Sequence, residues 1–145
     1  MTPAKAWIAL LLLLGISALA FRLVRRRARP APPPAAQGTR PALLGITGRY
    51  SGESIELGET GVTLGRDPRA ASLVFAHASS ISKRHCTVRW DAARRVFILE
   101  DHGSTNGTFL AGGERLTPDV PRDLPPGGRF YLGDLYTQFE VRLEA

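Results

Sequence analysis

The stretch 86-CTVRWDAARRVFIL-99 decides the fold of this chain. Apolar and polar side chains alternate along Cys86–Trp90, and residues 96–99 form a short run of β-prone residues. Alternation with a period of two indicates a strand that buries one face. The stretch therefore predicts β-structure, and its predicted core residues are Val88, Trp90, Phe97 and Leu99.

Short β-prone runs, separated by turn residues, lie on both sides of this stretch. They comprise residues 43–47, 54–57, 62–65, 73–75, 108–110, 130–132 and 137–143. Pairs such as Asn106-Gly107 and Gly133-Asp134 mark turns, and nothing after Pro41 shows sustained helical periodicity. The spacing predicts an all-β domain, a two-sheet β-sandwich. Its further predicted core residues are Phe130, Leu132, Phe139 and Val141.

The basic residues of the chain are unevenly distributed. Seven of the 19 lie within residues 1–42, which contain no acidic residue, so 12 basic and 13 acidic residues remain beyond them. The pI of 10.4 thus comes from the N-terminal segment alone. A folded part without excess positive charge does not predict nucleic-acid binding.

Residues 6–21 form an uncharged apolar run that can be interpreted in two ways. With Leu23 and Val24 it approaches the length of a transmembrane helix, whereas Ala18-Leu19-Ala20 resembles a signal-peptide cleavage site. Five arginines follow the run and only Lys5 precedes it, which favours a membrane anchor with the C-terminal side in the cytoplasm. A targeting or nucleic-acid role for the arginines is the less favoured reading.

Three segments follow from these patterns. Residues 1–27 are predicted to be a single transmembrane anchor with a basic flank. Residues 28–41 are predicted to be an extended Pro/Ala-rich linker, because proline fixes φ and removes a hydrogen-bond donor. Residues 42–145 are predicted to be the folded domain, which the membrane anchor holds at the cytoplasmic face of the cell membrane.

Three polar clusters lie between the predicted strands: Gly65-Arg66, Ser82-Lys83-Arg84-His85, and residues 104–108 with Asn106-Gly107. In this order within an all-β chain, they resemble the signature of the forkhead-associated (FHA) domain family, a Gly-Arg, a Ser-x-x-His and an Asn-Gly. The resemblance covers residues 43–143. It implies a β-sandwich that binds phosphothreonine peptides. Neither enzymatic activity nor a cofactor is predicted for the chain.

The residue types in these clusters suit that ligand. A phosphothreonine carries nearly two negative charges and three acceptor oxygens, so its site needs several fixed donors. Arg66 offers a guanidinium fork, Ser82 and Thr105 offer hydroxyls, and Lys83 offers an ammonium or backbone N–H. The resemblance further implies that Asn106 holds the main chain of the peptide. It implies supporting roles for Gly65, His85 and Gly107.

Enzymatic and metal-binding readings are weaker. Ser82, His85, Cys86 and His102 could supply a nucleophile and a base, but Cys86 shares the inward parity of Val88, and no nucleophile elbow or nucleotide loop is present. The three histidines and Cys86 lack the close spacing of typical ligand pairs, so no metal site is predicted.

The expected partner is a phosphothreonine-containing protein or a Ser/Thr kinase, not a small-molecule substrate or nucleic acid. The alternative that stays open is a phosphate-independent FHA-fold scaffold or an oligomerisation subunit of a membrane complex.

The anchor makes a prediction about topology. A reporter that functions only in the cytoplasm should be active when it is fused after Ala145. The reason is that the arginines following the apolar run keep the C-terminal side of the anchor in the cytoplasm. Paired fusions to a cytoplasmic and an extracytoplasmic reporter measure this directly. Activity of the extracytoplasmic fusion would refute the assigned orientation.

Overall fold

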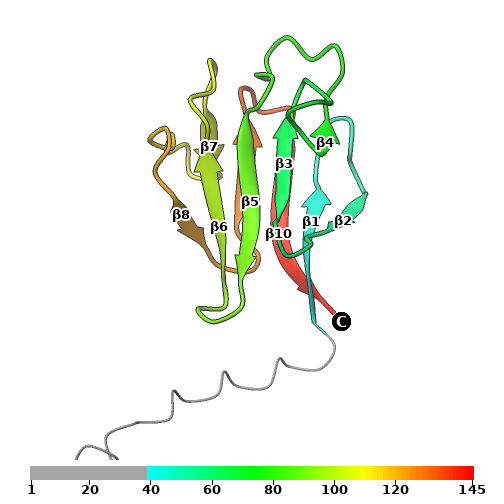
Figure 1. Cartoon of the computed structure of the whole chain (residues 1–145), viewed down its shortest axis with the longest axis vertical. Coiled ribbons are helices and arrows are strands. Elements are labelled where there is room, and N and C mark those ends of the chain that lie inside the picture. The colour runs from blue at the N-terminus through cyan, green and yellow to red at the C-terminus, as the bar shows by residue number, and fades with distance from the viewer. Residues whose placement is uncertain (1–38) are drawn as a thin grey trace, which may run out of the picture. The chain divides into compact units, whose positions relative to one another are not determined.

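The computed structural model describes residues 39–145, which form two five-stranded sheets packed face to face (Figure 1). The first sheet contains, in spatial order, β2 (Ser54–Glu56), β1 (Arg40–Gly45), β10 (Gln138–Glu144), β9 (Arg129–Leu132) and β7 (Thr108–Leu110). The second contains β4 (Leu73–Val74), β3 (Val62–Gly65), β5 (Cys86–Asp91), β6 (Val96–Asp101) and β8 (Arg122–Leu124). Only β3 and β4 pair in parallel.

The prediction of an all-β, two-sheet sandwich is confirmed for these residues. Every predicted β-prone run overlaps a strand, and of the strands in the described residues the sequence missed only β8. This strand pairs with the outer edge of β6, where Leu124 alone is buried and Arg122 and Asp123 are exposed. A three-residue edge strand with one apolar residue carries too little alternation to be recognised.

The predicted anchor of residues 1–27 lies outside the described residues, as does most of the predicted linker. Among residues 39–145, no helix has the length and apolar character needed to cross a membrane. Arg40 and Pro41, assigned to the linker from the sequence, lie in β1 and pair with Glu144 and Leu143.

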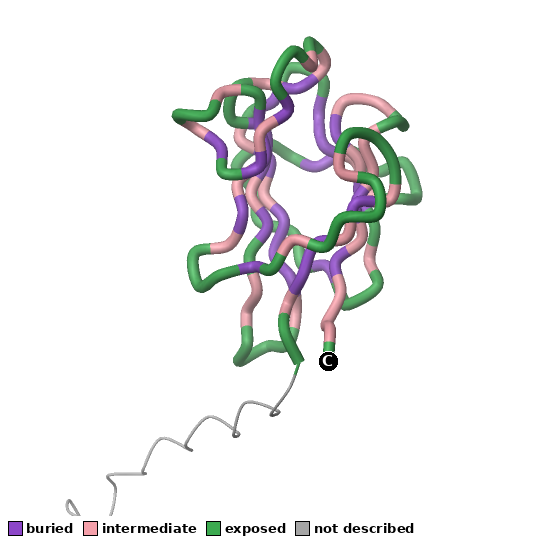
Figure 2. The backbone as a smooth tube through the Cα atoms, turned by 90° about the vertical axis from the view of Figure 1, so that its right-hand side faces the viewer, coloured by how far each residue is buried: buried purple, intermediate pink, exposed green. Residues whose placement is uncertain are grey.

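The core consists of inward side chains from both sheets. Figure 2 marks in purple where the buried residues lie along the backbone. Phe139 lies at its centre, with ring centroids 5.7 Å from Phe130 and 6.1 Å from Phe75. Seven of the eight predicted core residues are fully buried. The exception is Trp90, which is half-buried near the end of β5 and packs against Phe97 with a centroid distance of 4.6 Å.

Cys86 faces the core, as its parity predicts. It is a free thiol with no exposed surface, and burial raises its pKa far above the ordinary value. A thiol that is neither accessible nor ionised is packing, not a nucleophile.

The strand directions bring the three polar clusters to one end of the sandwich. β3 and β6 run toward this end and β5 starts from it, so three loops lie there (Figure 1). They are the first loop (residues 66–72), the second loop (75–85) and the third loop (102–107). Arg40 and the C-terminal Glu144 pair at the opposite end. The loop end of the domain therefore faces away from the point where the described chain begins.

Candidate functional site

A pocket of about 390 Å³ lies among these loops. The residues that line it are Arg66, Ser79, Ile81, Ser82, Lys83, Arg84, Thr105 and Asn106. All five residues predicted to contact a phosphopeptide are among them, and they come from three separate segments of the chain. The sequence did not single out Arg84 for this pocket, although it stands inside the Ser-x-x-His cluster.

The cations of the pocket are available to a ligand. Arg66, Lys83 and Arg84 are exposed, and none of them forms an ion pair with another residue in the part of the chain that the structure describes. The backbone N–H of Arg66 donates to the carbonyl of Ser82 at 2.9 Å, which ties the β3 end to the second loop. The pocket thus collects positive charge on a fixed backbone.

Ser82 and Thr105 are joined directly. The backbone N–H of Thr105 donates to the Oγ of Ser82 at 3.0 Å, and because that oxygen accepts here, its own hydroxyl proton remains free to donate. Asn106 donates from Nδ2 to the carbonyl of Ser80 at 2.9 Å. Its Oδ1 and second amide hydrogen are left for another partner, so one donor and one acceptor remain for a peptide main chain.

His85 is buried between the second and third loops. The backbone N–H of Ser82 donates to its Nδ1 at 3.1 Å, so Nδ1 must be unprotonated. Nε2 then carries the proton and donates to the carbonyl of Gly107 at 3.0 Å. Burial lowers the pKa of His85, although the Gly107 hydrogen bond and the charge of Asp101 oppose that effect. The neutral ring joins the two loops and does not line the pocket.

Asp101 is a functional residue that the sequence reading missed. Its buried carboxylate accepts from the backbone N–H of Ser104 at 2.9 Å, from the Ser104 hydroxyl at 2.5 Å and from the Thr108 hydroxyl at 2.7 Å. Burial raises the pKa of Asp101, but the bonds from Ser104 and Thr108 outweigh burial and hold it below the ordinary value. Asp101 thereby fixes the loop that carries Thr105 and Asn106.

A signal for Asp101 was present in the sequence. Phe97 and Leu99 alternate toward the core, and Asp101 continues the same parity. A carboxylate at a core-facing position is rare unless it is fully hydrogen-bonded, so this position marks a built polar network.

The two glycines predicted to support the loops have steric reasons to be glycine. A Cβ at Gly65 would lie 2.2 Å from the carbonyl oxygen of Lys83, so a side chain would push the second loop away from β3. Gly107 has a φ of +90°, which L-residues rarely adopt.

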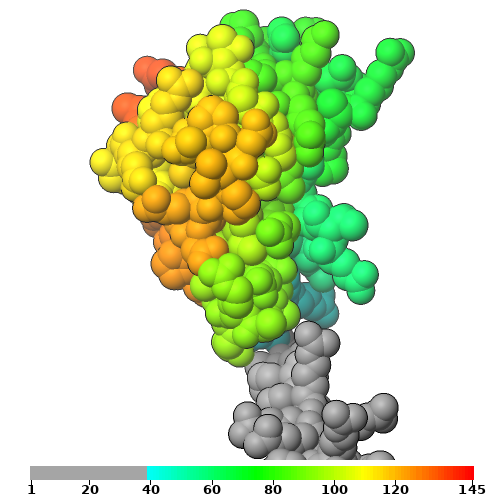
Figure 3. Space-filling view, turned by 60° about the vertical axis from the view of Figure 1, so that its left-hand side comes forward, coloured from blue at the N-terminus to red at the C-terminus, as the bar shows by residue number. Residues whose placement is uncertain are grey.

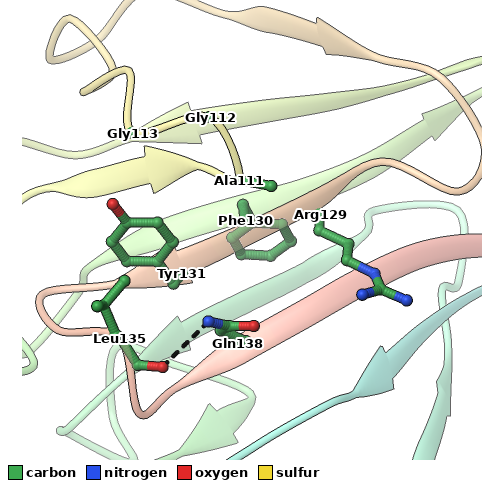
Figure 4. A pocket seen from close by; sticks show the side chains of 8 residues that line it. All are labelled: Ala111, Gly112, Gly113, Arg129, Phe130, Tyr131, Leu135 and Gln138. Atoms are coloured by element: carbon green, nitrogen blue, oxygen red, sulfur yellow. Dashed lines mark hydrogen bonds between the residues drawn. The ribbon is translucent and has the colours of Figure 1, made fainter.

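A second concavity, of about 310 Å³, lies on the outer side of the first sheet (Figure 4). It is lined by the segment 111–113, by β9 residues such as Tyr131, and by Leu135 and Gln138. Its one cation, Arg129, is paired with Glu140 at 2.7 Å. The residues that line this groove offer no unpaired cation for a dianion, so the phosphate chemistry belongs to the first pocket.

A family model described as the FHA domain matches residues 62–133. The chain therefore contains an FHA domain. FHA domains are a family of phosphothreonine-peptide-binding modules, typically non-catalytic. The matched residues include all three polar clusters and both loops that His85 connects.

Solved FHA domains have the same fold. The FHA domain of the CT664 protein from Chlamydia trachomatis has a TM-score of 0.61 and 24% identity, covering 73% of this chain and 99% of that chain. An FHA domain from Arabidopsis thaliana has a TM-score of 0.60 and 25% identity, covering 74% of this chain and 88% of that chain. An FHA domain studied for phosphothreonine-dependent interactions has a TM-score of 0.56 and 28% identity, covering 74% of this chain and 99% of that chain. Another similar FHA domain was solved with a phosphothreonine peptide. No curated protein gives a significant sequence match.

The buried imidazole predicts a pH dependence of stability. Because the pKa of His85 is lowered by folding, the unfolded chain takes up the proton first, and stability falls as the pH drops below about 6.5. Asp101, whose pKa is also lowered, adds a further loss only as the pH approaches about 4. Urea unfolding at pH 7 and pH 5 should therefore show a lower midpoint at pH 5.

The matched variant is His85→Gln, which lacks the titrating group. It should be less stable than the wild type at pH 7 but lose less between pH 7 and pH 5. Equal urea midpoints for the wild-type protein at the two pH values would contradict the buried neutral imidazole.

Proposed function

We propose that this chain binds phosphothreonine-containing proteins through the pocket at the loop end of its FHA domain. In this proposal Arg66, Ser82, Lys83 and Thr105 bind the phosphate, and Asn106 holds the peptide main chain beside it. The observation that carries the proposal is that all five residues, from three segments, line one pocket of about 390 Å³. A constitutive scaffold would have no need of this set of donors.

The charge of the pocket suits a dianion on a peptide. Phosphothreonine carries almost two negative charges at neutral pH, and the pocket offers Arg66, Lys83 and Arg84 without competing ion pairs in the described residues. Because acidic residues slightly outnumber basic ones beyond residue 42, the attraction is local to the pocket. Binding is therefore expected to require the phosphate.

The proposal also includes a membrane location. The apolar run 6–21 and the arginines after it support a single-pass anchor with the FHA domain in the cytoplasm, where kinases act. The pocket lies at the end of the domain opposite Arg40, so an anchored domain would present it away from its attachment point. Such a module would recruit Ser/Thr-phosphorylated proteins, or a Ser/Thr kinase itself, and raise their concentration at the membrane.

A phosphate-independent scaffold or oligomerisation subunit is the second candidate. The observation that favours it is the groove on the first sheet, beside which Leu135 and Tyr136 are 64% and 80% exposed. Large exposed apolar side chains next to a groove are typical of protein-interaction surfaces. The two candidates use different faces, so one pair of variants separates them.

Arg66→Ala should weaken binding of a phosphothreonine peptide at least tenfold. A charge-assisted hydrogen bond contributes about 1.5 to 3 kcal/mol, and 1.4 kcal/mol corresponds to a factor of ten in Kd. Fluorescence anisotropy with the full-length protein and a labelled phosphopeptide library measures this, and the same peptides without phosphate should not bind.

The control variant is Arg89→Ala, which removes an exposed arginine from β5 that does not line the pocket. It should bind as the wild type does. If Arg66→Ala binds its partner as well as Arg89→Ala does, the scaffold candidate replaces phosphopeptide binding.

A further inference from the structure

Three potential metal ligands converge on the second sheet, away from the phosphopeptide pocket. They are Glu100, His102 and Asp119, and each offers one ligand atom within 4.8 Å of the other two. None of them lines the pocket. The sequence reading predicted no metal site, because it considered only histidine and cysteine spacing, and two of these ligands are carboxylates.

The backbone explains why the three residues meet. Glu100 and His102 flank Asp101, which points into the core, so both lie on the opposite, outward side at the end of β6. Asp119 returns to this place from the β7–β8 connection, where its N–H donates to the carbonyl of Asp101 at 2.7 Å. Figure 3 shows this connection, yellow to orange, at the surface of the domain.

The ring of His102 is oriented by a hydrogen bond at Nε2. Its Nε2 lies 2.7 Å from the Thr87 hydroxyl, which in turn lies 3.0 Å from the Thr63 hydroxyl. The other ring nitrogen, Nδ1, faces the Asp119 carboxylate at 4.0 Å, too far for a hydrogen bond. The side chain is only 11% exposed. Metal-binding histidines have this arrangement, with one nitrogen fixed by a hydrogen bond and the other free for the ion.

The charges of the cluster are also unbalanced. Glu100 makes no side-chain hydrogen bond or ion pair with any residue between 39 and 145. Among the same residues, the only ion-pair contact of the Asp119 carboxylate is with His102, although the Glu100 carboxylate lies nearby. Two carboxylates close together repel each other, and a cation between them removes that repulsion. A dication would also fill the space between Nδ1 of His102 and the Asp119 oxygen.

We propose that Glu100, His102 and Asp119 bind a divalent transition-metal ion. One imidazole and two carboxylates suit Zn²⁺, whose ligands lie about 2.0 to 2.2 Å from the ion and whose fourth position would be taken by water. Asp119, 75% exposed, has room to close the remaining distance. The bound ion would fasten the β7–β8 connection to the end of β6 and stabilise the folded domain by mass action.

Isothermal titration of the full-length protein with Zn²⁺ tests the site. The wild type should bind about one equivalent, with a rise in Tm, as expected for an ion held by the folded state alone. His102→Ala should bind at least tenfold more weakly. Glu100→Gln, which keeps the shape of the side chain, should fold as the wild type does and also bind at least tenfold more weakly.

The matched control is His77→Ala, since the chain has three histidines and His77 is exposed on a different loop. It should bind Zn²⁺ as the wild type does, and in imidazole NMR spectra Zn²⁺ should shift His102 and leave His77 and His85 in place. No saturable binding, or equal binding by the wild type and both site variants, would overturn the proposal. An equal loss in His77→Ala would also overturn it. None of these outcomes bears on phosphopeptide binding measured without added metal, so the metal site and the proposed function are tested separately.

Discussion

The carboxylate of Asp101 lies where β6 ends and the loop with Thr105 and Asn106 begins. It is buried, and hydrogen bonds from Ser104 and Thr108 satisfy it. A charge taken out of water without such partners costs several kcal/mol, so the loop can close over Asp101 only in the conformation that supplies those donors. The Ser104 hydroxyl also accepts from the Gly107 N–H at 3.0 Å, which extends the constraint through the loop.

His85 transmits this constraint to the second loop. It accepts from Ser82 and donates to Gly107, so the loop that Asp101 fixes is held in register with the loop that carries Ser82 and Lys83. Gly65 permits the close approach of that second loop to β3 and Arg66. The pocket combines cations from two loops with a hydroxyl from the third. The buried polar network behind it, and not the pocket residues alone, fixes the positions of these loops.

The sequence predicted the fold because alternation and turn residues are local patterns, and the loop residues it named lie together at one pocket. Alternation at Cys86–Trp90 located a central strand, and the Ser-x-x-His and Asn-Gly clusters located loops that meet at one pocket. The network behind the pocket was missed because its only local signal is the inward parity of Asp101, while the donors Ser104 and Thr108 fold back from later positions. The proximity of Asp119 to His102 depends on the path of the β7–β8 connection, which no local pattern encodes.

The most direct test of the phosphopeptide pocket is an amide NMR titration of the full-length protein with a phosphothreonine peptide and with its unphosphorylated twin. The phosphorylated peptide should shift the amides of Arg66, Ser82, Lys83, Thr105 and Asn106, with little effect on the first sheet. The twin should shift none of them. Equal shifts with both peptides, or shifts confined to the groove beside Tyr131, would contradict the account.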